Sequence, residues 1–373
     1  MDFSLSDECG AVDDLAERIF SDQVSPERFR GLGEDQFDRH LWAELANAGL
    51  LGISLPEGHG GAGLGFLATA LVLERAGRHA APVPVLPTLV MGAMPIAQFG
   101  TSDQKDSILP RVVSGELVVT AALLEPGADP SCPATTASTD GSGWRITGAK
   151  TCVPAGLLAG YLLVPASTGG GGVAVFIIDA RSEGVEVVPL ETTSGSPDAR
   201  VELSAVRARP DDVVGAPGGG AEVVEWTVAR ATAALCSQMA GVAAQAVALT
   251  ASYAKTREQF ERPIATFQAV AQRLADAYID AEALALTSRQ AAWRLSQGLR
   301  AREEVLIAKY WAAEGGQRVV HAAQHIHGGM GVDRDYPLHR YFLLAKQLEL
   351  TLGGSTAHLL ALGRLLASEP ANV

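Results

Sequence analysis

The sequence predicts an α+β fold in three parts: a helical N-terminal domain, a small β-sandwich or β-barrel in the middle, and a C-terminal four-helix bundle. Apolar residues recur at helical spacing up to about residue 115 and again after about residue 220. Short apolar runs separated by turn signals fill the stretch between them. The length of 373 residues is too great for one compact core. We therefore expect domains over residues 1–115, 116–220 and 221–373.

The N-terminal domain should consist of helices joined by loops. Apolar residues follow a helical period over residues 41–48, and Gly49 is suited to end that helix. A further helix is expected over residues 66–78, after a glycine-rich loop at residues 58–65. The prolines at positions 82, 84 and 87 interrupt the pattern and predict a loop.

The middle domain should be built of β-strands. The run Leu117–Leu124 has a β-like composition, and Asp140-Gly141 is a hairpin signal before a further apolar run at residues 144–147. The other expected strands are residues 161–164, 173–178, 185–190 and 201–206. Strands at this spacing are typical of a small sandwich or barrel.

The C-terminal domain is rich in alanine and leucine, and its period predicts four long antiparallel helices. They are expected over residues 222–256, 264–297, 301–323 and 338–368. Mostly apolar stripes on four such helices favour a bundle.

Composition and charge limit the classes of function. With 47% hydrophobic and 19% charged residues, the chain should be globular. The formal net charge of −13 argues against a nucleic acid or an anionic membrane as partner, since both need a basic face. The four cysteines are far apart, the acidic first eight residues lack a signal-peptide pattern, and no apolar run is expected to reach the roughly 18 residues of a membrane span. We therefore expect a cytoplasmic protein.

Two patterns suggest other chemistry but lack the necessary context. Residues 58–63 match the G-x-G-x-x-G of dinucleotide-binding proteins, which requires a preceding strand and a βαβ unit. Only residues 52–55 could form such a strand here. His321 and His325 are four residues apart, as zinc ligands on one helix face are, but no cysteine or carboxylate joins them at ligand spacing. We therefore expect a plain glycine loop and no metal site.

Two segments of the C-terminal domain carry a more specific signal. The first, from Tyr253 to Asp276, reads YAKTREQFERPIATFQAVAQRLAD, and the second, from His325 to Gly331, reads HIHGGMG and is followed by YPLHR. They resemble motifs of the acyl-CoA dehydrogenase family, R-x-x-F-G-x-P-I-x-x-F-Q and Q-x-x-G-G-x-G. LPE at residues 55–57, LEPGA at 124–128 and ITGAK at 146–150 resemble further motifs of that family, so the resemblance covers the whole chain.

The resemblance implies FAD-dependent α,β-dehydrogenation of an acyl-CoA thioester. In the family, the two segments bind the ADP half of an FAD that a neighbouring subunit mainly holds. The candidate cofactor-binding residues are the matched positions Arg257, Phe260, Ile264, Phe267, Gln268, Gln324, His325, Gly328 and Gly329. A guanidinium at position 257 can pair bidentately with a pyrophosphate, and the two glycines let the backbone approach a ligand where a Cβ would collide. Part of each phenylalanine is expected in the core.

The family's catalytic base is missing from the sequence. The family carries a glutamate immediately before a Gly-Thr or Gly-Gly step in its last helical region, where it removes the α-proton of the substrate. Here Leu352 precedes Gly353-Gly354, and leucine cannot accept a proton. Glu349, three residues earlier, is interpreted as a helix-surface charge. Some relatives carry the base near the start of the bundle beside an arginine, but the matching Ala231-Thr232 has no carboxylate.

Positions that contact the flavin ring in the family are altered as well. The threonine of T-E-P is Leu124, and G-S-D has become Ala-Asp-Pro at residues 128–130. The family's W-I-T/S after the lysine is Cys152-Val153-Pro154, and proline offers neither a hydroxyl nor an N–H. Arg-Asp before an Ala-Lys pair is replaced by Leu343-Leu344, and the glutamine of Q-x-x-G-G aligns with His325.

Loss of both base positions and of the flavin-ring contacts, with the interface segments kept, resembles the smaller, base-lacking subunit of heteromeric α2β2 acyl-CoA dehydrogenases. This resemblance implies a partner dehydrogenase subunit that supplies the glutamate and most of the flavin pocket. It also implies, with less support, CoA esters of steroid side chains as substrates. Two alternatives stay open: a homomeric active enzyme that uses an unrecognised carboxylate such as Glu349, and a cofactor-free scaffold protein of the same fold.

Overall fold

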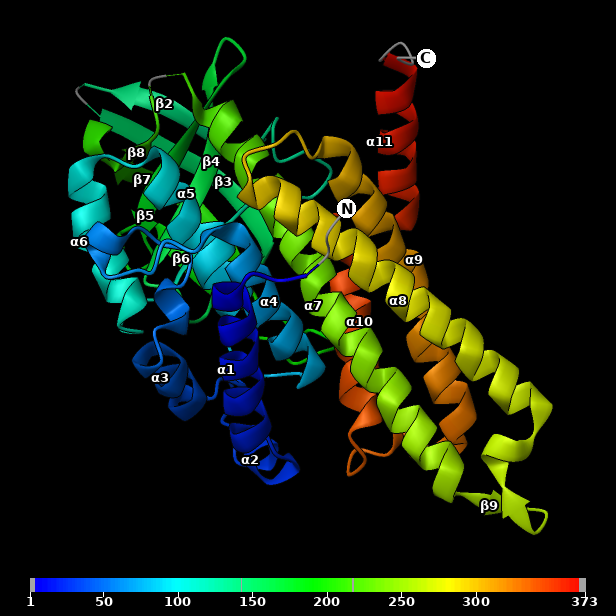
Figure 1. Ribbon diagram of the computed structural model, residues 1–373. Coiled ribbons are helices and arrows are strands. Elements are labelled where there is room, and N and C mark those ends of the chain that lie inside the picture. The colour runs from blue at the N-terminus through cyan, green and yellow to red at the C-terminus, as the bar shows by residue number, and fades with distance from the viewer. Residues whose placement is uncertain (1–3, 142, 217, 369–373) are drawn as a thin grey trace. The chain divides into compact units, whose positions relative to one another are not determined.

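The computed structural model of the protein describes residues 4–141, 143–216 and 218–368, which Figure 1 shows as a ribbon. It divides into two compact units. We call the first the helical unit, and it consists of Met1–Gly31, Phe66–Ala81 and Thr232–Val373. We call the second the β unit, and it consists of Leu32–Gly65 and Pro82–Ala231. The helices expected in the N-terminal domain are thus distributed between the two units.

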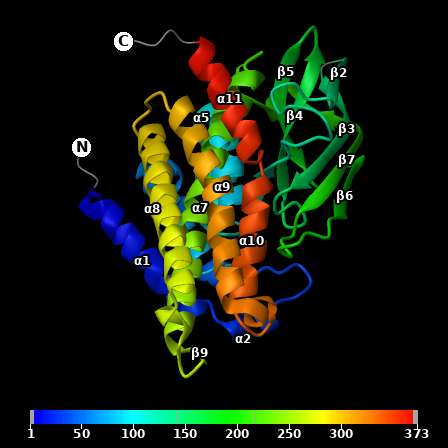
Figure 2. The same cartoon turned by 90° about the vertical axis from the view of Figure 1, so that its right-hand side faces the viewer.

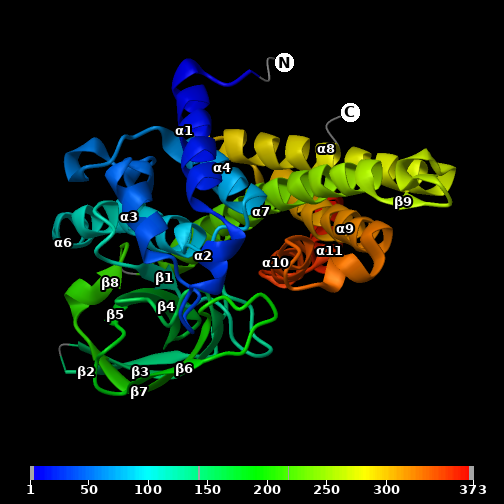
Figure 3. The same ribbon diagram turned by 90° about the horizontal axis from the view of Figure 1, so that it is seen from below.

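The β unit is organised around an eight-stranded sheet with the order β6-β7-β3-β2-β4-β5-β8, and β1 pairs in parallel with β4. The strands are β1 (Val119–Ala121), β2 (Thr136–Asp140), β3 (Gly143–Val153), β4 (Tyr161–Gly169), β5 (Gly172–Asp179), β6 (Val185–Pro189), β7 (Ala199–Ala208) and β8 (Val213–Val214). Figure 3 shows β3, β6 and β7 in one layer and β4, β5 and β8 in another. Apolar side chains of several strands, among them Ile146, Val164, Phe176 and Leu203, form one buried core. The β region expected in the middle of the chain is confirmed.

Two local predictions in the β unit were wrong. The run Leu117–Leu124 forms a strand only over Val119–Ala121, because a fully buried apolar run has no period that marks its ends. The prolines at 82–87 do not all lie in a loop, since the helix η3 (Leu86–Ala93) begins within that stretch. Pro87 lies in its first turn, where the missing N–H has no intrahelical acceptor to lose. The predicted hairpin turn is present, and it places Asp140 opposite Gly143.

Short helices complete the β unit. They are α3 (Arg39–Asn47), η1 (Leu50–Gly52), η2 (Glu57–His59), α5 (Met94–Phe99), α6 (Ser102–Val113) and η4 (Pro210–Asp212). The stretch at residues 52–55, which could have been a strand, ends η1 and continues as a turn. A Cβ on Gly61 would lie 2.1 Å from the carbonyl oxygen of Leu55, so the glycine-rich loop packs against its own backbone. This close approach explains the glycine without a nucleotide.

The helical unit contains the bundle. Its helices are α1 (Asp7–Gln23), α2 (Pro26–Arg30), α4 (Gly65–Arg78, from Phe66 onward), α7 (Gly220–Thr256, from Thr232 onward), α8 (Gln268–Ser296), α9 (Arg302–His327), α10 (Leu338–Leu350) and α11 (Ser355–Ser368). Figure 2 shows α7, α8, α9 and α10 side by side. The fourth predicted helix is in fact two, because the chain turns at residues 351–354 with Leu352 and Gly353 in left-handed conformations.

α4 and α7 pack closely within the helical unit. A Cβ on Gly241 of α7 would lie 1.8 Å from the carbonyl oxygen of Glu74 on α4, so a larger residue would push the two helices apart. Tight contact of this kind leaves little room for repacking, since protein interiors are close-packed.

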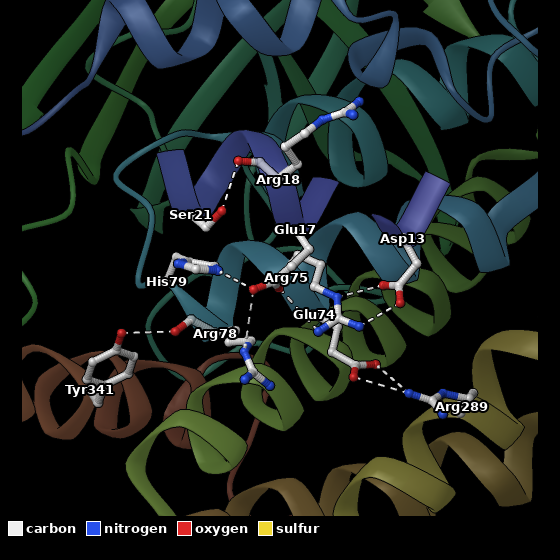
Figure 4. A network of polar contacts seen from close by, with 10 residues as sticks. All are labelled: Asp13, Glu17, Arg18, Ser21, Glu74, Arg75, Arg78, His79, Arg289 and Tyr341. Carbon is white, nitrogen blue, oxygen red and sulfur yellow. Dashed lines mark hydrogen bonds and ion pairs between the residues drawn. The ribbon is translucent and has the colours of Figure 1, made fainter. Parts of the chain in front are cut away.

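A network of ion pairs joins α1, α4 and α8 around this contact (Figure 4). Arg75 donates to both carboxylate oxygens of Asp13, with Nε–Oδ1 and Nη2–Oδ2 distances of 2.7 and 2.5 Å. Glu17 accepts from Arg75 and contacts the imidazole of His79, and Glu74 accepts from Arg289 of α8 at 3.2 Å. Because these groups are half-buried and mutually paired, the network fixes how the three helices pack.

α7 requires a correction to the sequence analysis. Its length and composition are sufficient for a membrane span, which we had not expected of any segment. However, 67% of its most apolar window is buried inside the structure, as in the core helix of a soluble protein. The cytoplasmic location stays a prediction, and the first three residues of the acidic start lie outside the described residues.

Candidate functional site

The first matched segment forms a hairpin after α7. The backbone N–H of Arg257 donates to the carbonyl of Tyr253 (2.8 Å), and the carbonyl of Arg257 accepts from Ile264 (2.8 Å). Between them, β9 (Glu258–Gln259) pairs with β10 (Arg262–Pro263). The two turn residues, Phe260 and Glu261, have φ values of 52° and 65°, as a tight primed hairpin turn requires. The hairpin therefore presents Arg257 and Phe260, both exposed, on a rigid loop.

The phenylalanines of this segment pair with each other. Phe260 is 87% exposed, so the expectation that part of it is core was wrong. Its ring meets that of Phe267 edge to face at 6.2 Å, and the guanidinium of Arg262 lies 4.3 Å above the ring of the half-buried Phe267. The positive φ at Phe260 turns its side chain away from the bundle, which sequence spacing alone does not reveal.

Ile264 and Gln268 of the same segment lie just beyond the hairpin. Ile264 is half-buried at the start of the short helix η5 (Ile264–Thr266), and Gln268 is the exposed first residue of α8. Val270 and Ala271 of α8 donate their backbone N–H groups to the carbonyl of Phe267 (3.0 Å each), and the positive end of a helix dipole favours an anion nearby. The structure thus places all five matched residues of the segment between the end of α7 and the start of α8.

The second matched segment ends α9. Gly328 has φ 59° and ψ −132°, a backbone conformation that is essentially restricted to glycine, and it starts the turn η6 (Gly328–Val332). The side-chain amide of Gln324 donates to the carbonyl of Gly328 (3.2 Å), so this glutamine helps to end its own helix. A Cβ added to Gly328 or Gly329 would meet no atom within 4 Å, and both residues are exposed. The backbone here is open to a large ligand.

His327 connects the two segments. Its ring stacks on Tyr253, with 4.3 Å between centroids and 22° between planes. Its Nδ1 lies 2.8 Å from the carbonyl of Ala323, which can only accept, so Nδ1 carries the proton. Its Nε2 then accepts from the hydroxyl of Tyr336 at 3.0 Å. Burial lowers the pKa of His327, which keeps the imidazole neutral and this arrangement intact.

Neither His327 nor Tyr253 was predicted from the sequence to be a positioning residue. Tyr253 is one helical turn before Arg257, and His327 directly precedes Gly328. The signal was available, because both rings stand next to the matched positions, but only the fold shows that they face each other.

His325 lies in a different environment, in an open groove between α8 and α9. The groove has a volume of about 600 Å³, and its lining includes Arg273, Ile279, Arg318 and His321. Arg318 is held there by Asp280, with N–O distances of 2.6 and 2.8 Å. His321 and His325 therefore share one groove, and its lining also includes Asp276 and Asp280, whose carboxylates offset the charge of the two arginines.

The described residues near Leu352 include the carboxylate of Glu349 and the imidazole of His358, whose buried Nδ1 has no hydrogen-bond partner in the structure. Glu349 accepts from Lys346 at 2.6 Å, and its side chain is only 15% exposed. The interpretation of Glu349 as a surface charge was therefore wrong, because its carboxylate is a mostly buried member of an ion pair. The carbonyl of Leu352 accepts from Nε2 of His358 at 2.9 Å, and burial lowers the pKa of that histidine.

A buried lysine fixes the end of α10 just before Leu352. Nζ of Lys309 donates to the carbonyls of Leu348 (2.6 Å) and Glu349 (3.1 Å), which are among the last of the helix. Such carbonyls have no intrahelical partner, so a cation there is favourable. Burial lowers the pKa of Lys309 to about 8. The backbone just before Leu352 is thus held by a buried cation, and the side chain of Leu352 itself has no acid–base function.

In the β unit, two further matched motifs meet in a buried ion pair. Lys150 is fully buried, and its Nζ donates to Glu125 and, at 2.7 Å, to the carbonyl of Pro165. Glu125 also accepts from the N–H groups of Ala134 (2.6 Å) and Thr135 (3.1 Å). Burial opposes ionisation of Glu125, but Lys150 and these donors outweigh it and lower its pKa. The pair anchors the segment at residues 125–135, which carries the altered flavin-face positions.

The altered flavin-face position Cys152 is exposed and has a left-handed φ of 46°. Its neighbour Thr151 donates its backbone N–H to the carbonyl of Leu124 at 2.9 Å, so two altered motifs lie side by side. A thiol and a leucine occupy positions at which the resemblance expects hydrogen-bonding side chains.

Comparisons with known proteins agree with this arrangement. Residues 6–116 match the model of the acyl-CoA dehydrogenase N-terminal domain, and residues 218–366 match that of its C-terminal domain. The chain is 41% identical over 381 residues to the acyl-CoA dehydrogenase FadE27 of Mycobacterium tuberculosis, with both chains fully covered.

Two solved structures are similar over the whole chain. One is the ChsE4–ChsE5 complex from Mycobacterium tuberculosis, with a TM-score of 0.94, 41% identity and full coverage of both chains. The other is a variant of the Tcur3481–Tcur3483 steroid ACAD, with a TM-score of 0.91, 45% identity, and coverage of 98% of this chain and 99% of that one.

Proposed function

Because the chain belongs to the acyl-CoA dehydrogenase family, whose cofactor is FAD, we propose that it acts in α,β-dehydrogenation of an acyl-CoA thioester as a subunit without a catalytic base of its own. The observation that carries the proposal is Leu352 at the family's base position, with Glu349 already engaged by Lys346. A carboxylate locked in an ion pair is a poor proton acceptor. A partner dehydrogenase subunit would supply the glutamate.

This chain's own contribution to the cofactor site would be the surface formed by the hairpin after α7 and the turn η6 after α9. FAD, when bound, accepts a hydride from the β-carbon of the acyl group. Arg257 would pair with the pyrophosphate, and the open backbone at Gly328 and Gly329 would allow close approach of the ADP half. The exposure of both loops is consistent with a group held mainly by a neighbouring subunit. The stacked rings of His327 and Tyr253 would fix the position of one loop relative to the other.

A partner subunit is also supported by the outer face of α8. Ile279, Leu286 and Trp293 are 63%, 54% and 42% exposed, and they follow each other at intervals of seven residues. A seven-residue apolar repeat produces a continuous stripe along one helix face, which is the pattern of helices that pack against another helix. We propose that the catalytic subunit covers this stripe in a hetero-oligomer of α2β2 type. The complex named for one structural relative is consistent with this.

One of these relatives also supports a proposal for the substrate class. One similar structure is described as a steroid ACAD, and we propose CoA esters of steroid side chains as substrates of the assembled enzyme. The experiment is co-expression with candidate partner dehydrogenases, followed by oxidation assays with a steroid side-chain CoA ester and with a straight-chain acyl-CoA.

Variants separate this proposal from its alternatives. Replacing the partner's base glutamate with glutamine should abolish turnover of the complex, whereas Leu352→Ala and Glu349→Gln in this chain should preserve it. Loss of turnover in Glu349→Gln, with flavin still bound, would instead support a homomeric enzyme with an atypical base. Absence of flavin from every assembly would support the scaffold alternative.

A further inference from the structure

Arg230, on the part of α7 that belongs to the β unit, is a half-buried cation stacked on an aromatic ring. Its guanidinium carbon lies 3.7 Å from the centroid of Trp226, one helical turn earlier. Trp226 is in turn held edge to face by Phe99 of α5, with 5.5 Å between centroids and 85° between planes. One flat face of the guanidinium is thus covered by a fixed indole.

Arg230 has no anionic partner among the described residues of the β unit. Burial alone lowers its pKa, to about 10, and no nearby charge or hydrogen bond opposes that effect. On a helix, the residue four positions earlier is the usual place for a paired carboxylate, and that place holds Trp226. Its chain neighbours are Ala229 and Ala231, and Glu225 is exposed.

Arg75 and Arg289, which are also half-buried, are paired with Asp13 and Glu74. Arg340, likewise half-buried, instead stacks on Phe29, with its guanidinium carbon 3.5 Å from the ring centroid. Partial removal of a cation from water is costly unless an anion or hydrogen-bond acceptors replace the water. Arg230 is therefore suited to accept an anion from outside the chain. A guanidinium whose face is covered still offers its N–H edge, which matches two oxygens in one plane.

We propose that Arg230 binds the carboxylate of a small organic acid with an apolar chain. The N–H edge would take the carboxylate bidentately, and the Trp226–Phe99 pair would provide an apolar wall for the chain. Inorganic phosphate is also an anion but has no apolar part, so binding of the two ligands can be distinguished. The proposal does not rest on the partner subunit or on FAD.

The test uses the full-length chain and follows the fluorescence of Trp226. The wild type and Trp226→Phe are titrated with hexanoate, acetate and inorganic phosphate at constant ionic strength with chloride. Their difference isolates the signal of this tryptophan. We expect saturable binding of hexanoate, weaker binding of acetate, and loss of the signal in Trp226→Phe.

Arg230→Gln and Arg230→Lys show whether the guanidinium is responsible. A bidentate charge-assisted pair is worth more than 1.4 kcal/mol, so hexanoate should bind at least about tenfold more weakly to both variants. Arg209→Gln, which removes an exposed arginine of the same unit, is the matched control and should bind as the wild type does. Circular dichroism confirms that each variant is folded.

The melting temperature provides a second readout that a purely structural role would not produce. Without ligand, Arg230→Met should melt at or above the wild-type temperature, because it removes an unpaired buried charge. Hexanoate should raise the melting temperature of the wild type but not of the variant. The proposal is overturned if hexanoate titrates Arg230→Gln like the wild type, if only phosphate saturates, or if Arg230→Met melts lower and no carboxylate binds.

Discussion

The ring of Tyr253 stacks on the imidazole of His327, 4.3 Å away, and this contact joins the end of α7 to the end of α9. Each ring stands next to a residue matched to the cofactor segments, Arg257 on one side and Gly328 on the other. The separation in sequence between the two loops is more than 60 residues, so neither loop can set the position of the other by itself. The stacked pair does so, and several predictions depend on it.

Replacement of His327 should allow the hairpin after α7 and the turn η6 to move relative to each other, without unfolding the chain. We expect His327→Ala to lower flavin occupancy of the assembled complex, because it removes the stacking and both hydrogen bonds of the imidazole. Tyr336→Phe, which removes one hydrogen bond, should have a smaller effect of about 0.5–1.5 kcal/mol. The measurement is bound FAD per complex by absorbance. Equal occupancy in His327→Ala and the wild type would contradict a positioning role.

The lowered pKa of His327 also predicts that the free energy of unfolding depends on pH. Its pKa is lowered in the folded state, so the unfolded chain binds the proton more readily at acidic pH. The stability that the neutral imidazole contributes is therefore fully present above its unfolded pKa of about 6.5 and is lost as the pH falls through the folded pKa. In urea unfolding between pH 7.5 and 5.5, the wild type should lose stability relative to His327→Gln, by at most about 1.4 kcal/mol per pH unit. A difference that does not change with pH would show that His327 is not held neutral.

Arg257 should matter for cofactor binding but not for folding. Its side chain is exposed at the base of the hairpin, so Arg257→Ala should leave the melting temperature of the lone chain unchanged. In the complex, loss of a charge-assisted bidentate pair should lower the affinity for FAD by about tenfold or more. Lys255→Ala, which removes a neighbouring exposed cation, is the control. If both variants weaken FAD binding equally, general charge rather than a specific pair is responsible.

The Glu125–Lys150 pair should dominate the stability of the β unit. Lys150→Met would leave a buried carboxylate with only backbone donors, at a cost of about 3–5 kcal/mol. The double variant Glu125→Gln/Lys150→Met removes both charges and should recover a large part of that loss. Unfolding of both variants in guanidinium chloride measures the difference. Additive losses in the double variant would show that the two side chains do not act as a pair.

Much of the fold was predictable from the sequence, and the exceptions have physical causes. Most strands of the middle region and the first three bundle helices were expected near their observed positions, because apolar spacing directly reflects burial. The interruption of the fourth bundle helix at Leu352 was not expected, because a leucine in the sequence does not indicate a left-handed φ. The uncharged stretch of α7 was overlooked as a span-like segment because alanines and small polar residues dilute its apolar character.

The cofactor-binding residues stay a prediction, and the way the two matched segments are organised was not predictable from the sequence. The matched positions lie on two loops, as the motifs indicate, but sequence alone placed Phe260 partly in the core and Glu349 on the surface. The turn conformation of Phe260 and the ion pair of Glu349 with Lys346 reversed both assignments. The environment of His327 is formed by contacts from three segments of the chain. No local sequence pattern shows that these segments meet.

The most direct test of the account is the FAD content and turnover of the lone chain compared with those of the assembled complex. The chain is purified alone and with its partner dehydrogenase, and FAD per chain and acyl-CoA oxidation are measured on both preparations. The account predicts little FAD and no turnover in the lone chain, with both present in the complex. One FAD per chain together with turnover in the lone preparation would contradict it.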